Sequence, residues 1–96
     1  MRWLITLAAH WAHIFYPSVP VDTLVHLAWT ESRFTLTARN PSGACGAFQI
    51  LPVAAGGWSC RDLMNPFIAA PRAAYLLSWA RRHYHGREIA WYKGRL

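Results

Sequence analysis

Apolar positions recur at helical spacing along most of the chain and predict an all-α protein. Between residues 2 and 16 they recur at intervals of three and four, which predicts a first helix with one apolar face. The residues expected on that face are Leu4, Leu7, Ala8, Trp11, Ile14 and Phe15. The segment 17–20 contains two prolines and should end this helix. A second helix is expected from about residue 20 to 32, with Asp22 placed in its first turn to complement the helix dipole.

A polar segment then separates this helix from the rest of the chain. Residues 35–47 are predicted to form a loop, and the turn residues Asn40-Pro41-Ser42-Gly43 lie inside it. Phe48 to Leu51 should form a short apolar element. Pro52 to Gly57 should add one or two helical turns before the Gly56-Gly57 pair interrupts them.

A long helix is predicted in the last third of the chain. Trp58 to Met64 is expected to be irregular, and Asn65-Pro66 should start a helix that runs to about His85, because Asn is a good cap and Pro suits the first helical position. Pro71 is expected to kink this helix or delay its start. Its outer face should be basic, through Arg72, Arg81, Arg82 and Arg87. Gly86 should stop it, and residues 87–93 are expected to form a last short helix.

Length and charge limit the possible functions without choosing among them. The chain has 96 residues, enough for one small domain, and 54% of them are hydrophobic. Ten Lys and Arg against four acidic residues give a net charge of +6, which suits an anionic partner such as nucleic acid, anionic lipid or bacterial cell wall. Six tryptophans could fill the core or stack on sugar rings. The apolar start resembles a signal peptide, but His10 and His13 interrupt it, so we interpret it as the first helix. No transmembrane helix is expected.

The cysteine and histidine patterns do not predict a metal site. Cys45 and Cys60 lack the spacing of a zinc motif, and the histidines form no ligand pattern. In an exported protein the two cysteines could form a disulfide that closes a loop of about 16 residues and contributes about 3 kcal/mol. In the cytosol they would be buried thiols, and the sequence leaves both alternatives open.

Glu31 is the residue with the clearest chemical potential. It lies seven, four and three residues after Leu24, Leu27 and Ala28, so it should share their apolar stripe. A carboxyl on such a stripe at a helix C-terminus is removed from water and meets the negative end of the helix dipole, and both effects favour its protonated form. A protonated carboxyl near neutral pH is what general-acid cleavage of a glycosidic bond requires. A salt bridge with Arg33 or Arg39, or a glutamate that turns to solvent, would explain the same pattern.

Two motifs at a fixed separation resemble a known family. Glu31-Ser32-Arg33-Phe34, followed after a loop by Gly43-Ala44-Cys45-Gly46-Ala47-Phe48-Gln49-Ile50-Leu51-Pro52, resembles the soluble lytic transglycosylase domain, a lysozyme-like family related to goose-type lysozyme. The downstream Asn65-Pro66 and Tyr75-Leu76 are similar to a later helix of that family, so the resemblance covers roughly residues 3–94. The chain stops where many relatives continue with another helix, so its C-terminal end is expected to be truncated relative to the family.

The resemblance implies a compact, lysozyme-like all-α domain over residues 1–96 with a glycan-binding groove. It implies that Glu31 protonates the bond between N-acetylmuramic acid and N-acetylglucosamine, then acts as the base that forms a 1,6-anhydro end. No cofactor or metal is expected. The implied partner is a peptidoglycan glycan strand, with no nucleic acid, and the implied state is a monomer in the periplasm or at the cell wall outside the cell. A phage enzyme or a secretion-system accessory would fit, and the export route is open.

The resemblance also implies a set of substrate-binding residues. They are Ser32, Asn40, Ser42, Gly46, Phe48, Gln49, Trp91 and Tyr92. Asn40 and Ser42 compete for one family position, because one has the usual spacing and the other the usual residue type. Trp91 and Tyr92 compete in the same way near the C-terminus. Two alternatives remain open: a hydrolytic muramidase, since a second carboxylate could lie nearby in space, and a degenerate module that binds peptidoglycan without cleaving it.

Overall fold

Helices dominate the part of the chain that the computed structural model describes, which is residues 1–84. The helices are α1 (Arg2–Phe15), α2 (Val21–Ser32), α3 (Cys60–Leu63) and α4 (Pro66–Tyr84), and the 3-10 helix is η1 (Pro52–Ala54). Two isolated β-bridges, Arg39 with Cys45 and Cys45 with Ile50, shape the loop between α2 and η1. The expected all-α class is therefore confirmed. The predicted stop at Gly86 and the helix expected over 87–93 lie outside the described residues.

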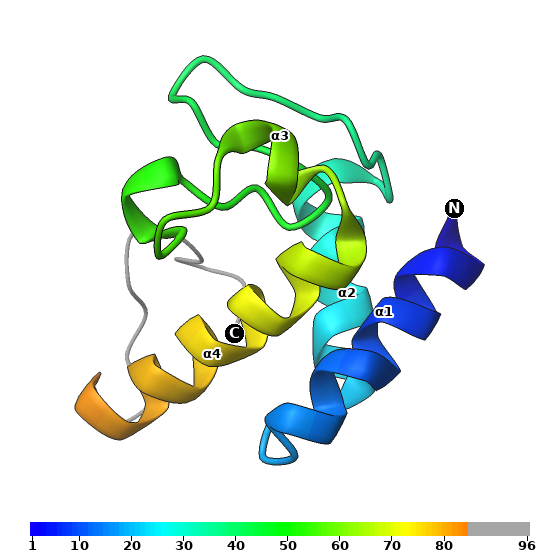
Figure 1. Ribbon diagram of the computed structural model, residues 1–96. Helices are drawn as coiled ribbons and strands as arrows, with labels where there is room; N and C mark the ends of the chain where they lie inside the picture. The colour runs from blue at the N-terminus through cyan, green and yellow to red at the C-terminus, as the bar shows by residue number, and fades with distance from the viewer. Residues whose placement is uncertain (85–96) are drawn as a thin grey trace.

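The three long helices pack around one core, with the α2–η1 loop and α3 at one end (Figure 1). α1 packs mainly on α4 and also on α2, and α2 runs behind both in the view of Figure 1. The core combines alanines from α1 and α4 with larger side chains from α1, α2, α3, α4 and the connecting segments. The largest fully buried side chains are Phe48, Ile5, Leu24, Leu27, Ile50, Leu63, Leu77, Val19 and Cys45.

The buried face of α1 differs from the predicted one. The side chains that α1 buries are Ile5, Ala8, Ala9 and Ala12, whereas Leu7, Trp11, Ile14 and Phe15 are exposed. Ala8 alone among the six expected residues is fully buried, and Leu4 is partly buried. Small side chains let α1 approach α4 and α2 closely, so the alanine side faces the core and the bulky side faces outward.

The α3 segment was expected to be irregular, and that expectation is wrong. The Ser59 hydroxyl accepts a hydrogen bond from the Asp62 backbone N–H (3.1 Å), and the Asp62 carboxylate accepts one from the Ser59 backbone N–H (3.0 Å). This reciprocal capping box fixes one turn of helix. Hydrogen bonds from the Ser59 backbone and then from the Ser59 hydroxyl hold the pKa of Asp62 below its usual value.

The long helix α4 begins where the sequence predicts. The Asn65 side-chain oxygen accepts a hydrogen bond from the Phe67 N–H (2.9 Å), and α4 starts at Pro66. Pro71 lies inside the helix and does not delay its start. Arg72 was expected on the solvated basic face, but its Nε donates to the Ala54 carbonyl (2.8 Å). Arg72 therefore ties α4 to η1.

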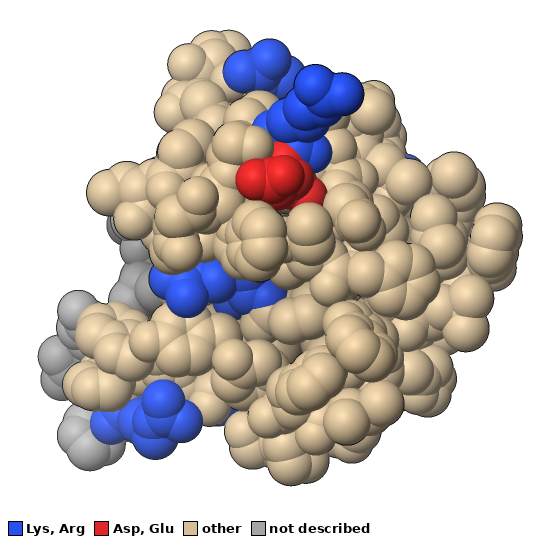
Figure 2. All heavy atoms as spheres, in the orientation of Figure 1, with Lys and Arg blue, Asp and Glu red and all other residues tan. Residues whose placement is uncertain are grey.

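On the face drawn in Figure 2, the charged side chains gather over part of the surface. Side chains coloured as basic and as acidic lie over the α3 end and over α4, while the part of this face over α1 shows none of them. The two exposed arginines Arg81 and Arg82 follow the expected basic face of α4. On this face, the region over α1 therefore differs from the α3 end in lacking acidic and basic side chains.

Candidate active site

Glu31 is held at the C-terminal end of α2, where the chain turns into the long loop. The other members of its stripe, Leu24, Leu27 and Ala28, are buried, and Glu31 itself is half-buried. Its Oε2 atom exposes less than 1 Å² to solvent. The predicted position of Glu31 on the core stripe is therefore confirmed, and its carboxyl lies at the edge of the core.

α2 ends sharply just after Glu31. Arg33 and Phe34 both adopt left-handed backbone conformations, with φ of 53° and 64°. The Arg33 N–H donates to the Trp29 carbonyl (2.9 Å), and the Arg33 guanidinium lies 4.5 Å from the centre of the Trp29 ring. Left-handed residues are how helices commonly terminate, although glycine usually takes the position. This turn directs the chain away from Glu31 into the loop.

Ser32 connects the end of α2 to the second motif. Its hydroxyl lies 2.7 Å from the Ala47 carbonyl and 3.1 Å from the Ala28 carbonyl, either of which can accept its proton. The same hydroxyl accepts a hydrogen bond from the Thr35 N–H (3.1 Å). Ser32, predicted to contact substrate, therefore fastens the loop segment around Ala47 beside Glu31.

Asn40 and Ser42 form one turn. The Asn40 side-chain oxygen accepts hydrogen bonds from the Ser42 hydroxyl (2.6 Å), the Ser42 N–H (3.0 Å) and the Ala44 N–H (3.0 Å). Both residues are exposed. The sequence presents them as alternatives for one family position, and the structure places them together, so a ligand at this turn would meet both.

Gly46 and Gln49 build the tight return of the second motif. Gly46 has a φ of 80°, and a Cβ atom on it would lie 2.1 Å from the Leu63 carbonyl oxygen. Gln49 is 5% exposed, and its side-chain nitrogen donates to the carbonyls of Gly46 (2.8 Å) and Ala38 (3.1 Å). These bonds hold together the two sides of the loop. In this structure Gln49 shapes the loop from inside.

Three other expected contact residues are not on the described surface. Phe48 is fully buried, so it supports the loop from the core. Trp91 and Tyr92 lie outside the described residues. Among the described residues, the predicted contact residues that reach the surface are therefore Asn40 and Ser42, which are exposed, and Ser32, which is partly exposed.

A disulfide fixes the loop to α3. Cys45 and Cys60 are joined, and their Cα atoms are 5.4 Å apart. Cys45 also takes part in both β-bridges of the loop. The loop that carries the second motif is thus fastened to the end of α2 through Ser32, to itself through Gln49 and to α3 through Cys45.

Comparison with protein families identifies the family of this chain. The family model described as the transglycosylase SLT domain matches residues 15–94, which is most of the chain. The chain belongs to the transglycosylase SLT family. No curated protein and no solved structure matched it.

The residues matched to the transglycosylase SLT domain include both sequence motifs. The fold brings the two motifs side by side through the Ser32–Ala47 hydrogen bond. The family identifies peptidoglycan as the substrate class.

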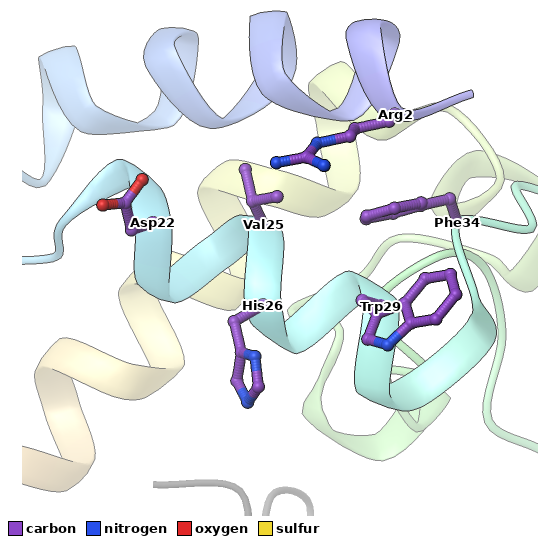
Figure 3. A pocket seen from close by; sticks show the side chains of 6 residues that line it. All are labelled: Arg2, Asp22, Val25, His26, Trp29 and Phe34. Atoms are coloured by element: carbon purple, nitrogen blue, oxygen red, sulfur yellow. The ribbon is translucent and has the colours of Figure 1, made fainter.

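A separate hollow lies on the other side of α2. It has a volume of about 430 Å³ and is lined by Arg2, Asp22, Val25, His26, Trp29 and Phe34. Figure 3 shows Arg2 reaching from α1 toward Val25. Phe34 and Trp29 lie at the end of the hollow opposite Asp22. Asp22 and Glu31 are nine positions apart, about two and a half helical turns, so they point to opposite sides of α2. This hollow is therefore distinct from the Glu31 side.

The described residues carry neither a metal cluster nor a spanning helix. Among residues 1–84, no group of three or more His, Cys, Asp or Glu side chains is placed to hold a metal ion. No helix in the same range is long and apolar enough to cross a membrane. The Nδ1 atom of His13 lies 2.8 Å from the Val19 carbonyl oxygen, and this contact joins α1 to the turn that follows it.

Proposed function

We propose that this SLT domain is a lytic transglycosylase that cleaves the bond between N-acetylmuramic acid and N-acetylglucosamine in peptidoglycan. The observation that carries the proposal is the position of Glu31, a half-buried carboxyl with one shielded oxygen beside the fastened second motif. Membership of the family supplies the substrate class. The domain, taken as residues 1–96, would act on a glycan strand lying along the Glu31 side of the α2–η1 loop.

The chemistry needs one carboxyl in two states. Glu31 gives its proton to the glycosidic oxygen, and the bond from that oxygen to the muramoyl C1 breaks. The muramoyl C6 hydroxyl then attacks C1, and the Glu31 carboxylate takes its proton. The product is a 1,6-anhydro-muramoyl end, no water is consumed, and Glu31 returns to its starting state. No second carboxylate is required, which suits a chain with four acidic residues.

The contact residues are proposed from the family resemblance together with the exposure and hydrogen bonds of the loop residues. The exposed Asn40–Ser42 turn would bind the glycan, and Ser32, Gly46, Phe48 and Gln49 would position the loop on which it lies. Trp91 and Tyr92 remain proposed substrate contacts from the resemblance alone. A disulfide-linked domain that acts on peptidoglycan belongs in the periplasm or outside the cell, because thiols stay reduced in most cytosols.

The test is digestion of purified peptidoglycan with the end groups read by mass spectrometry. We expect anhydro-muramoyl ends from the wild type, and a fall in rate of about 10²–10⁴-fold for Glu31→Gln, which keeps the shape but loses the transferable proton. Asp22→Asn is the matched control, because it alters the other carboxyl of α2 on the opposite side and should retain the wild-type rate.

Other outcomes would redirect the assignment. Reducing ends would identify a hydrolytic muramidase, and binding to insoluble peptidoglycan without release of fragments would identify a binding module. A Glu31→Gln protein with the full rate of the wild type would exclude Glu31 as the acid.

A further inference from the structure

α1 presents a continuous apolar surface to solvent. Its exposed members, called the α1 stripe below, are Trp3 (66% exposed), Leu7 (52%), Trp11 (44%), Ile14 (70%) and Phe15 (53%). They are five of the ten large hydrophobic side chains that are exposed in the described residues. Single exposed apolar side chains are ordinary, but a contiguous patch on one element indicates a contact with something outside the chain.

The α1 stripe occupies one side of the helix along its whole length. Its members recur at spacings of three and four, opposite the alanine side that faces α4 and α2. Trp11 and Phe15 pack edge to face, with ring centres 4.9 Å apart. A shallow hollow of about 870 Å³ adjoins the first turns, lined by Met1, Arg2, Trp3, Thr6, Leu7 and His10.

α1 itself carries one charged side chain, the cation Arg2. α1 contains no Asp or Glu, and the part of the surface over α1 shows no charged side chain in the view of Figure 2. Arg2 lies at its first turn. Beyond its last turn, the Arg81 guanidinium donates to the Ser18 carbonyl (3.1 Å), which places a second cation at the other end. The chain as a whole carries a net charge of +6.

We propose that the α1 stripe docks on the surface of an anionic lipid bilayer, with α1 lying in the plane of the interface. Leu7 and Ile14 enter the acyl boundary, and the indole rings of Trp3 and Trp11 lie at the level of the headgroups. Arg81, beyond the last turn of α1, and the net charge of +6 attract the lipid phosphates. A glycan strand would not explain the stripe, because exposed aliphatic side chains gain little from sugar. A second copy of the chain would bring together two domains that each carry +6.

The experiment is co-sedimentation with vesicles, which needs no enzymatic activity. The wild type should bind vesicles of phosphatidylcholine with phosphatidylglycerol, and this binding should shift its tryptophan fluorescence to the blue. It should bind vesicles of phosphatidylcholine alone much more weakly. Leu7→Gln/Ile14→Gln should reduce the partition coefficient at least about tenfold, because both changes remove apolar surface from the contact. Both positions are exposed, so far-UV circular dichroism and Tm should stay near the wild-type values.

Val53→Gln is the matched control, because Val53 is an aliphatic residue that is 90% exposed on η1, outside the α1 stripe. It should bind vesicles as the wild type does. The proposal is overturned if the wild type ignores anionic vesicles at low ionic strength, or if the double variant binds as well as the wild type. A dimer in sedimentation that the double variant dissociates, without vesicle binding, would overturn it in favour of a second copy.

Discussion

The tight return at Gly46 depends on a residue without a side chain. Gly46 combines a left-handed backbone, with φ of 80°, and a position where a Cβ atom would lie 2.1 Å from the Leu63 backbone oxygen. Backbone cannot move aside as a flexible side chain can, so the constraint is both conformational and steric. Because Gly46 lies one residue from the Ala47 carbonyl that Ser32 contacts, a shift here would move the loop away from Glu31.

Gly46→Ala and Gly43→Ala separate these two constraints. Gly43 has a φ of 92° but nothing within 4 Å of a Cβ atom, so its replacement should cost only the conformational term of about 1–2 kcal/mol. Gly46→Ala should cost the same term plus about 1–3 kcal/mol for the collision. Urea unfolding measures both variants. Equal losses of unfolding free energy would show that the contact with Leu63 relaxes without cost.

Individual residues of the site could be predicted to different extents. The position of Glu31 followed from the spacing of Leu24, Leu27 and Ala28, because helical periodicity fixes a shared face. The burial of Gln49 did not follow from sequence, since it depends on the Ala38 and Gly46 carbonyls, which only the folded loop brings together. Non-local hydrogen bonds of this kind leave no periodic signal.

Among the elements, α1 shows how side-chain size misleads a reading of periodicity. The segment is apolar on both sides, with large residues on one and alanines on the other. More weight was given to the large apolar side chains, so their side of the helix was predicted to be buried. The structure buries the alanine side, because close helix packing against α4 and α2 favours small residues there. The bounds of α1 and α2 and the start of α4 were predicted within a residue, as they depend on local prolines and caps.

The short helix α3 should respond to acid through its capping box. The pKa of Asp62 is lowered by hydrogen bonds from Ser59, so the folded state favours the carboxylate. Stabilisation from this group is therefore present above the pKa of an unfolded Asp, about 3.9, and is lost as the pH falls through the lowered folded value. The Tm difference between wild type and Asp62→Asn should be constant near neutrality and should shrink below about pH 4.

Ser59→Ala supplies the control for this titration. Ser59→Ala removes the hydroxyl that donates to the Asp62 carboxylate but keeps the backbone N–H, which is the larger cause of the lowered pKa, so adding Asp62→Asn should still change the pH profile of Tm, by less than it does in the wild type. Circular dichroism melts from neutral to acidic pH measure all four proteins. A difference between wild type and Asp62→Asn that persists unchanged into strong acid would exclude the capping box as its source.

On the scale of the whole molecule, the Cys45–Cys60 disulfide joins the motif-bearing loop to the helical body through α3. A sequence separation of 15 predicts that reduction lowers the free energy of unfolding by about 3 kcal/mol. For a domain of this size that is a fall in Tm of about 12–24 °C, measured by circular dichroism with and without reductant.

The Cys45→Ala/Cys60→Ala protein should melt near the reduced wild type and should not respond to reductant. The rate of peptidoglycan cleavage should also fall, because the loop that carries the second motif loses its covalent link to α3. The hydrogen bonds of Ser32 and Gln49 still hold the loop. An unchanged Tm on complete reduction, verified by thiol titration, would show that these hydrogen bonds alone hold the loop beside Glu31.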